Sequence, residues 1–105
     1  MAKKIQQLTG KQTKHLKGLG HHLPVVAMVG REGMTKTLII AVEEVLRAHE
    51  LVKIKIQNNC PFDRDDAAQQ LSEATGATVV QLLGKTVLLF RANDDPQKED
   101  TIHLP

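Results

Sequence analysis

Val25-Val26-Ala27-Met28-Val29-Gly30-Arg31-Glu32-Gly33-Met34-Thr35 is the stretch that decides the fold of this chain. An apolar run of strand length leads into a glycine-x-x-glycine loop, and the segment after the loop has the apolar spacing of a helix. Glycines let a backbone turn sharply and come close to a group outside the protein. A helix that follows such a loop directs its first N–H groups outward, where anions are favoured. The stretch therefore predicts a strand, a phosphate-binding loop and a helix.

A lysine-bearing helix is predicted before this stretch. Its apolar residues recur at helix-compatible spacing, and Thr9 is suited to cap its first turn. Gly18 to Gly20 would end it, and Pro24 disfavours helix at the residue before it. The run Val25–Val29 is nearly all apolar and predicts a strand buried on both faces. The apolar stripe of the helix is Ile5, Leu8, Leu16 and Leu19, and a broad separate face carries Lys11, Lys14 and Lys17.

Four further elements follow the loop. Thr35 is a plausible N-cap for a helix that runs to about Ala48. Residues 51–57 alternate between apolar and polar side chains, which predicts a strand with one open face. Asp63 begins a third helix and Gly76 ends it. Residues 77–83 and 86–91 predict two strands joined by a two-residue turn at Gly84-Lys85. The polar side of the alternating strand is Lys53, Lys55 and Gln57.

The predicted element order is helix, strand, helix, strand, helix, strand, strand. Two strand–helix–strand crossovers and a terminal hairpin imply an α/β fold of two layers, a four-stranded mixed sheet with helices packed on one face. We expect residues 1–92 to form a single domain and residues 93–105 to form an acidic, loosely ordered tail. A chain of 105 residues is long enough for one core and too short for two.

Composition narrows the class of protein. No apolar run reaches membrane-spanning length, and the N-terminus lacks the apolar stretch of a signal peptide, which favours the cytoplasm. The single cysteine, Cys60, excludes an internal disulfide. No serine or cysteine nucleophile stands near a histidine and an orienting acid, so an enzyme is not expected. No cofactor is expected either.

The formal net charge of +2 conceals an asymmetry along the chain. Residues 1–36 hold seven Lys/Arg and a single acid, Glu32, whereas residues 37–105 hold seven Lys/Arg and eleven acids. Clustered positive charge attracts polyanions even when the net charge is small. The first third of the chain therefore predicts binding to a polyanion, although a solvated helix face explains the same lysines.

The sequence offers little support for a nucleotide-binding loop, a metal site or an aromatic base-stacking surface. Gly84-Lys85-Thr86 resembles the end of a nucleoside-triphosphate loop, but the upstream glycine is missing and the turn joins two strands. The five histidines lack the spacing of metal ligands, and helix capping explains the acids at Asp63, Asp65 and Asp66, so no metal is expected. Phe62 and Phe90 are the only aromatics. RNA, if bound, should be contacted mostly at phosphates, with a steep salt dependence.

Several linked motifs resemble one known family. From about Ile5 to Arg91 the chain is similar to the CRM domain (chloroplast RNA splicing and ribosome maturation), and its size resembles the stand-alone, YhbY-like bacterial members. The resemblance implies RNA binding, association with precursors of the large ribosomal subunit, and a fold akin to the C-terminal domain of translation initiation factor three. The motifs are Leu8-Thr9-Gly10-Lys11-Gln12, Leu23-Pro24-Val25-Val26, Val29-Gly30-x-x-Gly33-x-Thr35, His49-Glu50-Leu51-Val52-Lys53 and Gly84-Lys85-Thr86-x-x-Leu89-Phe90-Arg91.

The resemblance also assigns roles to particular residues. The family's RNA-contacting loop falls on Gly30, Arg31, Glu32 and Gly33, and its basic surface falls on Lys11 and Lys14. To these we add Lys17 and Lys36, which are placed to neutralise phosphates. Two positions depart from the family pattern: Glu32 stands where basic or neutral polar residues are usual, and Phe90 where tyrosine is frequent. We expect a monomeric, non-catalytic RNA-binding protein; the alternative is a protein–protein adaptor whose basic third docks an acidic partner.

Overall fold

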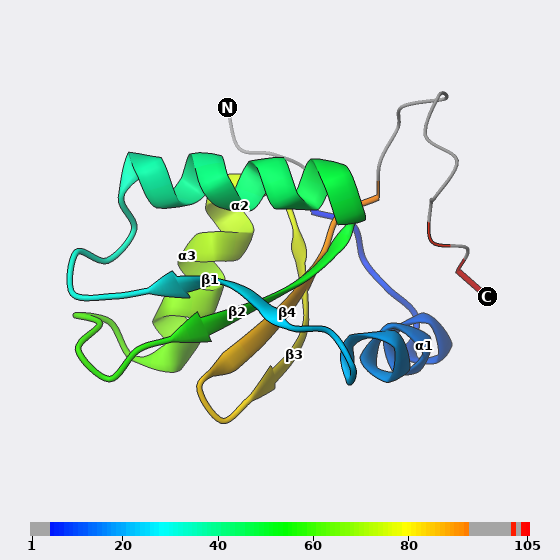
Figure 1. Ribbon diagram of the computed structural model, residues 1–105. Helices are drawn as coiled ribbons and strands as arrows, with labels where there is room; N and C mark the ends of the chain where they lie inside the picture. Colours follow the sequence, from blue (N-terminus) through cyan, green and yellow to red (C-terminus); the bar gives the residue numbers. More distant parts are fainter. Residues whose placement is uncertain (1–4, 93–101, 103) are drawn as a thin grey trace.

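The computed structural model describes residues 5–92, 102 and 104–105. The strands form one sheet in the order β1-β2-β4-β3, in which β1 and β2 are parallel and the other neighbours are antiparallel. The predicted α/β fold with a mixed four-stranded sheet is confirmed (Figure 1). The elements are α1 (Gly10–Gly20), β1 (Val25–Val29), α2 (Lys36–His49), β2 (Leu51–Ile56), α3 (Arg64–Thr75), β3 (Thr78–Leu83) and β4 (Thr86–Phe90).

The sequence explains where the helices begin and end. The side chains of Thr9, Thr35 and Asp63 accept hydrogen bonds of 3.1, 3.0 and 2.8 Å from the backbone N–H three residues further on. Each bond satisfies an N–H group that a helix start leaves without a partner. Gly76 ends α3 in the left-handed conformation, with a φ of 73°. The predicted caps are confirmed, but Leu8 lies before α1, so the predicted stripe starts too early.

The larger core lies between one face of the sheet and the helices α2 and α3. Alternate residues of β2 and β4 point into it, which is the period-2 pattern expected for a strand with two unlike faces. Figure 1 shows α2 and α3 covering this side of the sheet. The buried members are Val29, Val42, Leu46, Val52, Ile54, Ile56, Ala67, Ala68, Leu71, Ala77, Val87 and Leu89.

The helix α1 lies on the other face of the sheet. Its one fully buried apolar side chain, Leu16, packs with Leu51, Leu88 and Phe90, which alternate with the strand residues of the larger core. The expectation that all helices share one face is therefore wrong for α1. A single short helix covers only part of that face, and burying Leu16 stabilises its position by about 1.5–3 kcal/mol.

The strand β1 is an edge strand, and the expectation that it is buried on both faces is wrong. Val25, Val26 and Met28 are 42%, 43% and 54% exposed, whereas Val29 is fully buried. An unbroken apolar run is typical of a central parallel strand. Here β1 pairs with only one strand, β2. On the sheet face opposite to α2 and α3, the helix α1 covers only one end.

The described residues near the C-terminus return to the smaller core. Ile102 and Leu104 pack against the cluster around Leu16, and the Ile102 N–H donates a 2.6 Å hydrogen bond to the buried Glu50 carboxylate. The Gln12 side chain donates to the backbone oxygen of Pro105 over 3.3 Å. The rest of the expected tail, residues 93–101 and 103, lies outside the described residues.

Arg91, which follows β4, connects the end of this strand to both α2 and α3. Its guanidinium donates a 2.7 Å hydrogen bond to the Thr75 carbonyl, where α3 ends, and lies 3.6 Å from the Glu43 carboxylate on α2. Its own N–H bonds to the Glu50 carbonyl over 2.9 Å. This arginine closes the motif that resembles the CRM domain, and the structure gives it a structural role.

The change Arg91→Met should therefore lower the free energy of unfolding by about 1–2 kcal/mol, because it removes a charge-assisted hydrogen bond and a mostly buried ion pair, whose side chains are 24% and 22% exposed. Urea unfolding measures the loss. Arg91→Lys keeps the charge without the forked geometry and should lose less. A variant as stable as the wild type would contradict the structural role.

Candidate nucleic-acid interface

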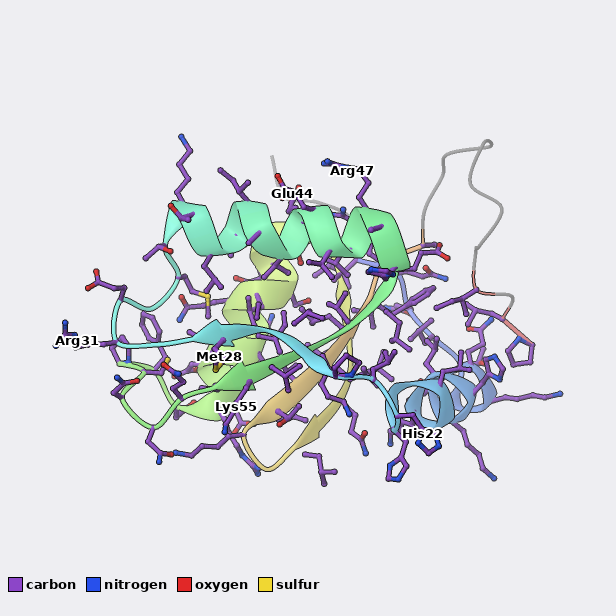
Figure 2. All side chains as sticks on the ribbon, in the orientation of Figure 1. His22, Met28, Arg31, Glu44, Arg47 and Lys55 are labelled. Atoms are coloured by element: carbon purple, nitrogen blue, oxygen red, sulfur yellow. The ribbon has the colours of Figure 1, made fainter. Side chains whose placement is uncertain are left out.

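The glycine-x-x-glycine loop connects the end of β1 to the start of α2. The Gly33 N–H donates a 3.0 Å hydrogen bond to the Gly30 carbonyl, which closes a tight turn. Arg31 and Glu32 occupy the exposed tip of this turn. In Figure 2 the Arg31 side chain extends away from the body of the molecule at one end of the sheet.

The two glycines of the loop face other parts of the protein. Gly33 is buried with a φ of +70°, and a Cβ there would lie 3.0 Å from the Phe62 ring and 3.3 Å from Pro61. A Cβ at Gly30 would lie 2.8 Å from the Gln57 side-chain oxygen. On the side where a Cβ would stand, both glycines thus lie against the neighbouring loop, residues 57–63. The approach of an external ligand to the loop backbone stays a prediction.

That neighbouring loop was not identified as part of the site from the sequence. The Gln57 N–H continues the β1–β2 ladder with a 2.9 Å bond to the Val29 carbonyl, and its side chain donates to Met28 Sδ over 3.4 Å. The ring of Phe62, which directly precedes the Asp63 cap of α3, lies against Gly33. An internal glycine contact leaves no periodic signal in a sequence, so only the folded chain reveals it.

The start of α2 adds N–H groups and a cation beside the loop. Thr35 caps the Leu38 N–H, while helix geometry leaves the N–H groups of Lys36 and Thr37 without an intrahelical acceptor. Lys36 is exposed, and the first turn of α2 contains no acid. Arg31, Lys36 and the helix start therefore favour an anion at this end of the sheet.

The lysines of α1 lie far from this loop. Lys11, Lys14 and Lys17 are exposed on the helix that precedes β1, whereas the loop follows β1. The 5 residues of β1, which lie between the two in the chain, span about 16 Å at roughly 3.3 Å per residue. Figure 1 shows α1 and the loop at opposite ends of the sheet. The sequence-predicted site residues thus form two basic regions.

Charge is divided between the two sides of the sheet. In the described part of the chain, α1 and the four strands contain no acid. Apart from Glu32, the described acids belong to α2, α3 or the residues that cap them: Glu43, Glu44, Glu50, Asp63, Asp65, Asp66 and Glu73. The side that carries α1 is therefore the side on which a polyanion meets the least repulsion.

Among the described residues, no group of three or more His, Cys, Asp or Glu side chains is arranged to hold a metal ion. None of the described helices combines the length and the apolar character needed to cross a membrane.

Comparison with known proteins identifies the family. The model of the CRS1 / YhbY (CRM) domain matches residues 8–91. The chain belongs to the CRM domain family. The Bacillus subtilis "Probable RNA-binding protein YqeI" is 34% identical over 98 residues, which cover 93% of this chain and 99% of that protein. A Haemophilus influenzae protein named "RNA-binding protein" is 35% identical over 98 residues, which cover 93% of this chain and 95% of that protein.

A solved structure confirms the fold of this CRM domain. A Staphylococcus aureus protein, determined in solution, superposes with a TM-score of 0.76 at 32% identity, covering 94% of this chain and 100% of that chain. Part of a plant protein is also similar to this chain: the rice "CRS2-associated factor 1, chloroplastic" is 30% identical over 66 residues, which cover 63% of this chain and 9% of that protein.

The two glycines of the CRM loop should differ in their tolerance of a side chain. Gly33→Ala should lower the free energy of unfolding by about 1–3 kcal/mol, because alanine is strained at a positive φ and its Cβ meets the Phe62 ring. Gly30→Ala should cost less than about 1 kcal/mol, because the Gln57 side chain can rotate away. Urea unfolding of both variants measures the difference. Equal losses would contradict the inward packing of Gly33.

Proposed function

We propose that this CRM domain binds RNA through its sugar–phosphate backbone. The loop Gly30, Arg31, Glu32 and Gly33, with Lys36 at the start of α2, forms one region of contact, and Lys11, Lys14 and Lys17 on α1 form the other. The division of charge carries the proposal, because α1, the strands and the loop present cations and a single described acid. The names of the bacterial relatives support RNA as the polyanion.

The two regions contribute different kinds of contact in this proposal. At the loop, the inward glycines hold a rigid turn, so Arg31 and the α2 N–H groups are positioned before RNA arrives. On α1, exposed lysines neutralise phosphates without fixed geometry. Glu32 repels phosphate and no described residue pairs with it, so its carboxylate must turn toward solvent when RNA is bound.

We further propose that the RNA belongs to precursors of the large ribosomal subunit and that the protein acts in the cytoplasm, as a monomer and without a catalytic step. The resemblance to the CRM domain supports the ribosomal part of this proposal. The alternative, an adaptor that docks an acidic protein, uses the same cations, so an experiment must separate the two.

Single charge reversals test the proposal on a transcript of precursor large-subunit ribosomal RNA. Arg31→Glu and Lys14→Glu should each weaken binding about tenfold near physiological salt and reduce the slope of log K against log salt by about 1, because each change removes a phosphate contact. Fluorescence anisotropy at several salt concentrations measures both quantities.

Arg47→Glu is the matched control. It changes the net charge equally, and Figure 2 places Arg47 on α2, away from Arg31. Its RNA affinity should stay within about twofold of the wild type. If Arg31→Glu and Lys14→Glu bind no worse than Arg47→Glu, the proposed interface is wrong. Docking of an acidic protein then becomes the better explanation of the positive charge in residues 1–36.

A further inference from the structure

Between the two basic regions, the sheet face that carries α1 is left uncovered, and its side chains lie in rows across the strands. Residues paired across neighbouring strands point to the same face, so the strand registers define rows that run across the sheet. An outer row, nearer the loop, is Met28, Lys55, Thr86 and Leu83; an inner row, nearer α1, is Val25, Lys53, Leu88 and Gln81.

The outer row exposes apolar side chains at both ends. Met28 is 54% exposed and Leu83 is 68% exposed, which is more than any other large apolar residue in the described chain. Lys55 lies between them and is also exposed. Figure 2 shows Met28 and Lys55 on this side, between Arg31 at one end and His22 at the other. The outer row therefore offers a ligand apolar contact at both ends and a cation between them.

The inner row forms the floor of a hollow beside the end of α1. The hollow has a volume of about 340 Å³ and is walled by Gly20, His21 and Leu23 on one side and by Leu83 on another. That volume falls within the roughly 300–1,000 Å³ of small-molecule sites. Lys53, Gln81, Thr86 and His21 supply polar groups to the hollow, and Val25 and Leu88 supply apolar surface.

The charges of this face select its occupant. The two rows contain lysines and no acid, and α1, which borders the hollow, contains no acid either. A polyanion is therefore favoured over an acidic-and-basic protein surface. The apolar ends of the outer row need a partner that also has uncharged planar faces. An unpaired stretch of RNA combines negative charge with uncharged planar faces, because its unstacked bases can turn away from the sugar–phosphate backbone.

We propose that this face binds unpaired nucleotides of the same RNA that the loop and α1 hold. Lys53 and Lys55 contact phosphates, Met28 and Leu83 contact the faces of bases, and one base enters the hollow, where His21 and Gln81 present hydrogen-bonding groups. Aliphatic contact is weaker than stacking on an aromatic ring, so each base contributes modestly. The inference rests on the proposed RNA binding and adds that single strands are preferred to duplexes.

Three fluorescent probes test the inference: a short uridine oligomer, an abasic oligomer of the same length, and a duplex with the same number of phosphates per strand. The wild type should bind the uridine oligomer about fivefold or more tighter than the abasic one, because only the former has bases to contact the apolar row. The double variant Met28→Ser/Leu83→Ser should lose about tenfold in affinity for uridine, keep its salt slope, and bind the duplex as before.

Ile40→Ser is the matched control, because Ile40 is 50% exposed on α2, away from the open face. It should change the affinity for no probe. The variant Lys53→Gln/Lys55→Gln should reduce the salt slope on the uridine oligomer by about 0.7 for each lysine. Equal binding of uridine and abasic oligomers by the wild type, or a Met28→Ser/Leu83→Ser variant equal to Ile40→Ser, would overturn the inference.

The outcomes also separate this inference from the function on which it rests. If Arg31→Glu weakens binding to every probe while the open-face variants match the control, the backbone contact stands and the open-face inference fails. If the wild type binds none of the probes and no ribosomal precursor RNA, both fail together.

Discussion

The end of α1 lies directly on the open face of the sheet: a Cβ at Gly20 would come within 2.5 Å of Leu88 Cδ2. This contact seats α1 over the apolar end of β2 and β4, where Leu51 and Phe90 are buried with Leu16. At the other end of the same strands the residues on that side are Lys55 and Thr86, which need no cover. A helix that packed closer to the loop would bury Lys53 or Lys55, and burying a charge without a partner is unfavourable. The position of α1 therefore follows from the point at which the residues on this face change from apolar to polar.

The seating of α1 determines the surface that RNA would meet. Because α1 covers only one end, its lysines stand at one limit of the open face and the glycine-x-x-glycine loop stands at the other. The charges follow the same division, since the described acids gather on α2 and α3 behind the sheet, apart from Glu32. The proposed interface is consequently a track along one side of the molecule, with a basic region at each end and a mixed apolar and basic face between them.

The loop shows how packing and function share the same residues. A glycine-x-x-glycine motif suggests close approach to a ligand, and here the same glycines also pack within the protein, since a Cβ at Gly33 would meet Phe62 and a Cβ at Gly30 would meet Gln57. The Gly33 N–H closes the turn on the Gly30 carbonyl, and the exposed tip of the turn presents Arg31 beside the start of α2. In the proposed function the ligand is met by the side chain of Arg31 and by the N–H groups of α2, while the glycines position them.

The sequence by itself determined the features that depend on neighbouring residues. The caps at Thr9, Thr35 and Asp63, the turn at Gly84 and the alternation of residues 51–57 are local patterns, and the structure confirms each. The tertiary structure alone decided which face α1 covers, that β1 is an edge strand, and that the Lys11 and Arg31 regions lie apart. Those properties depend on contacts between segments distant in the chain, such as Gly20 with Leu88 and Gly33 with Phe62. Such contacts leave no periodic pattern in the sequence, because the residues on either side of each partner are the same whether or not the two partners are in contact.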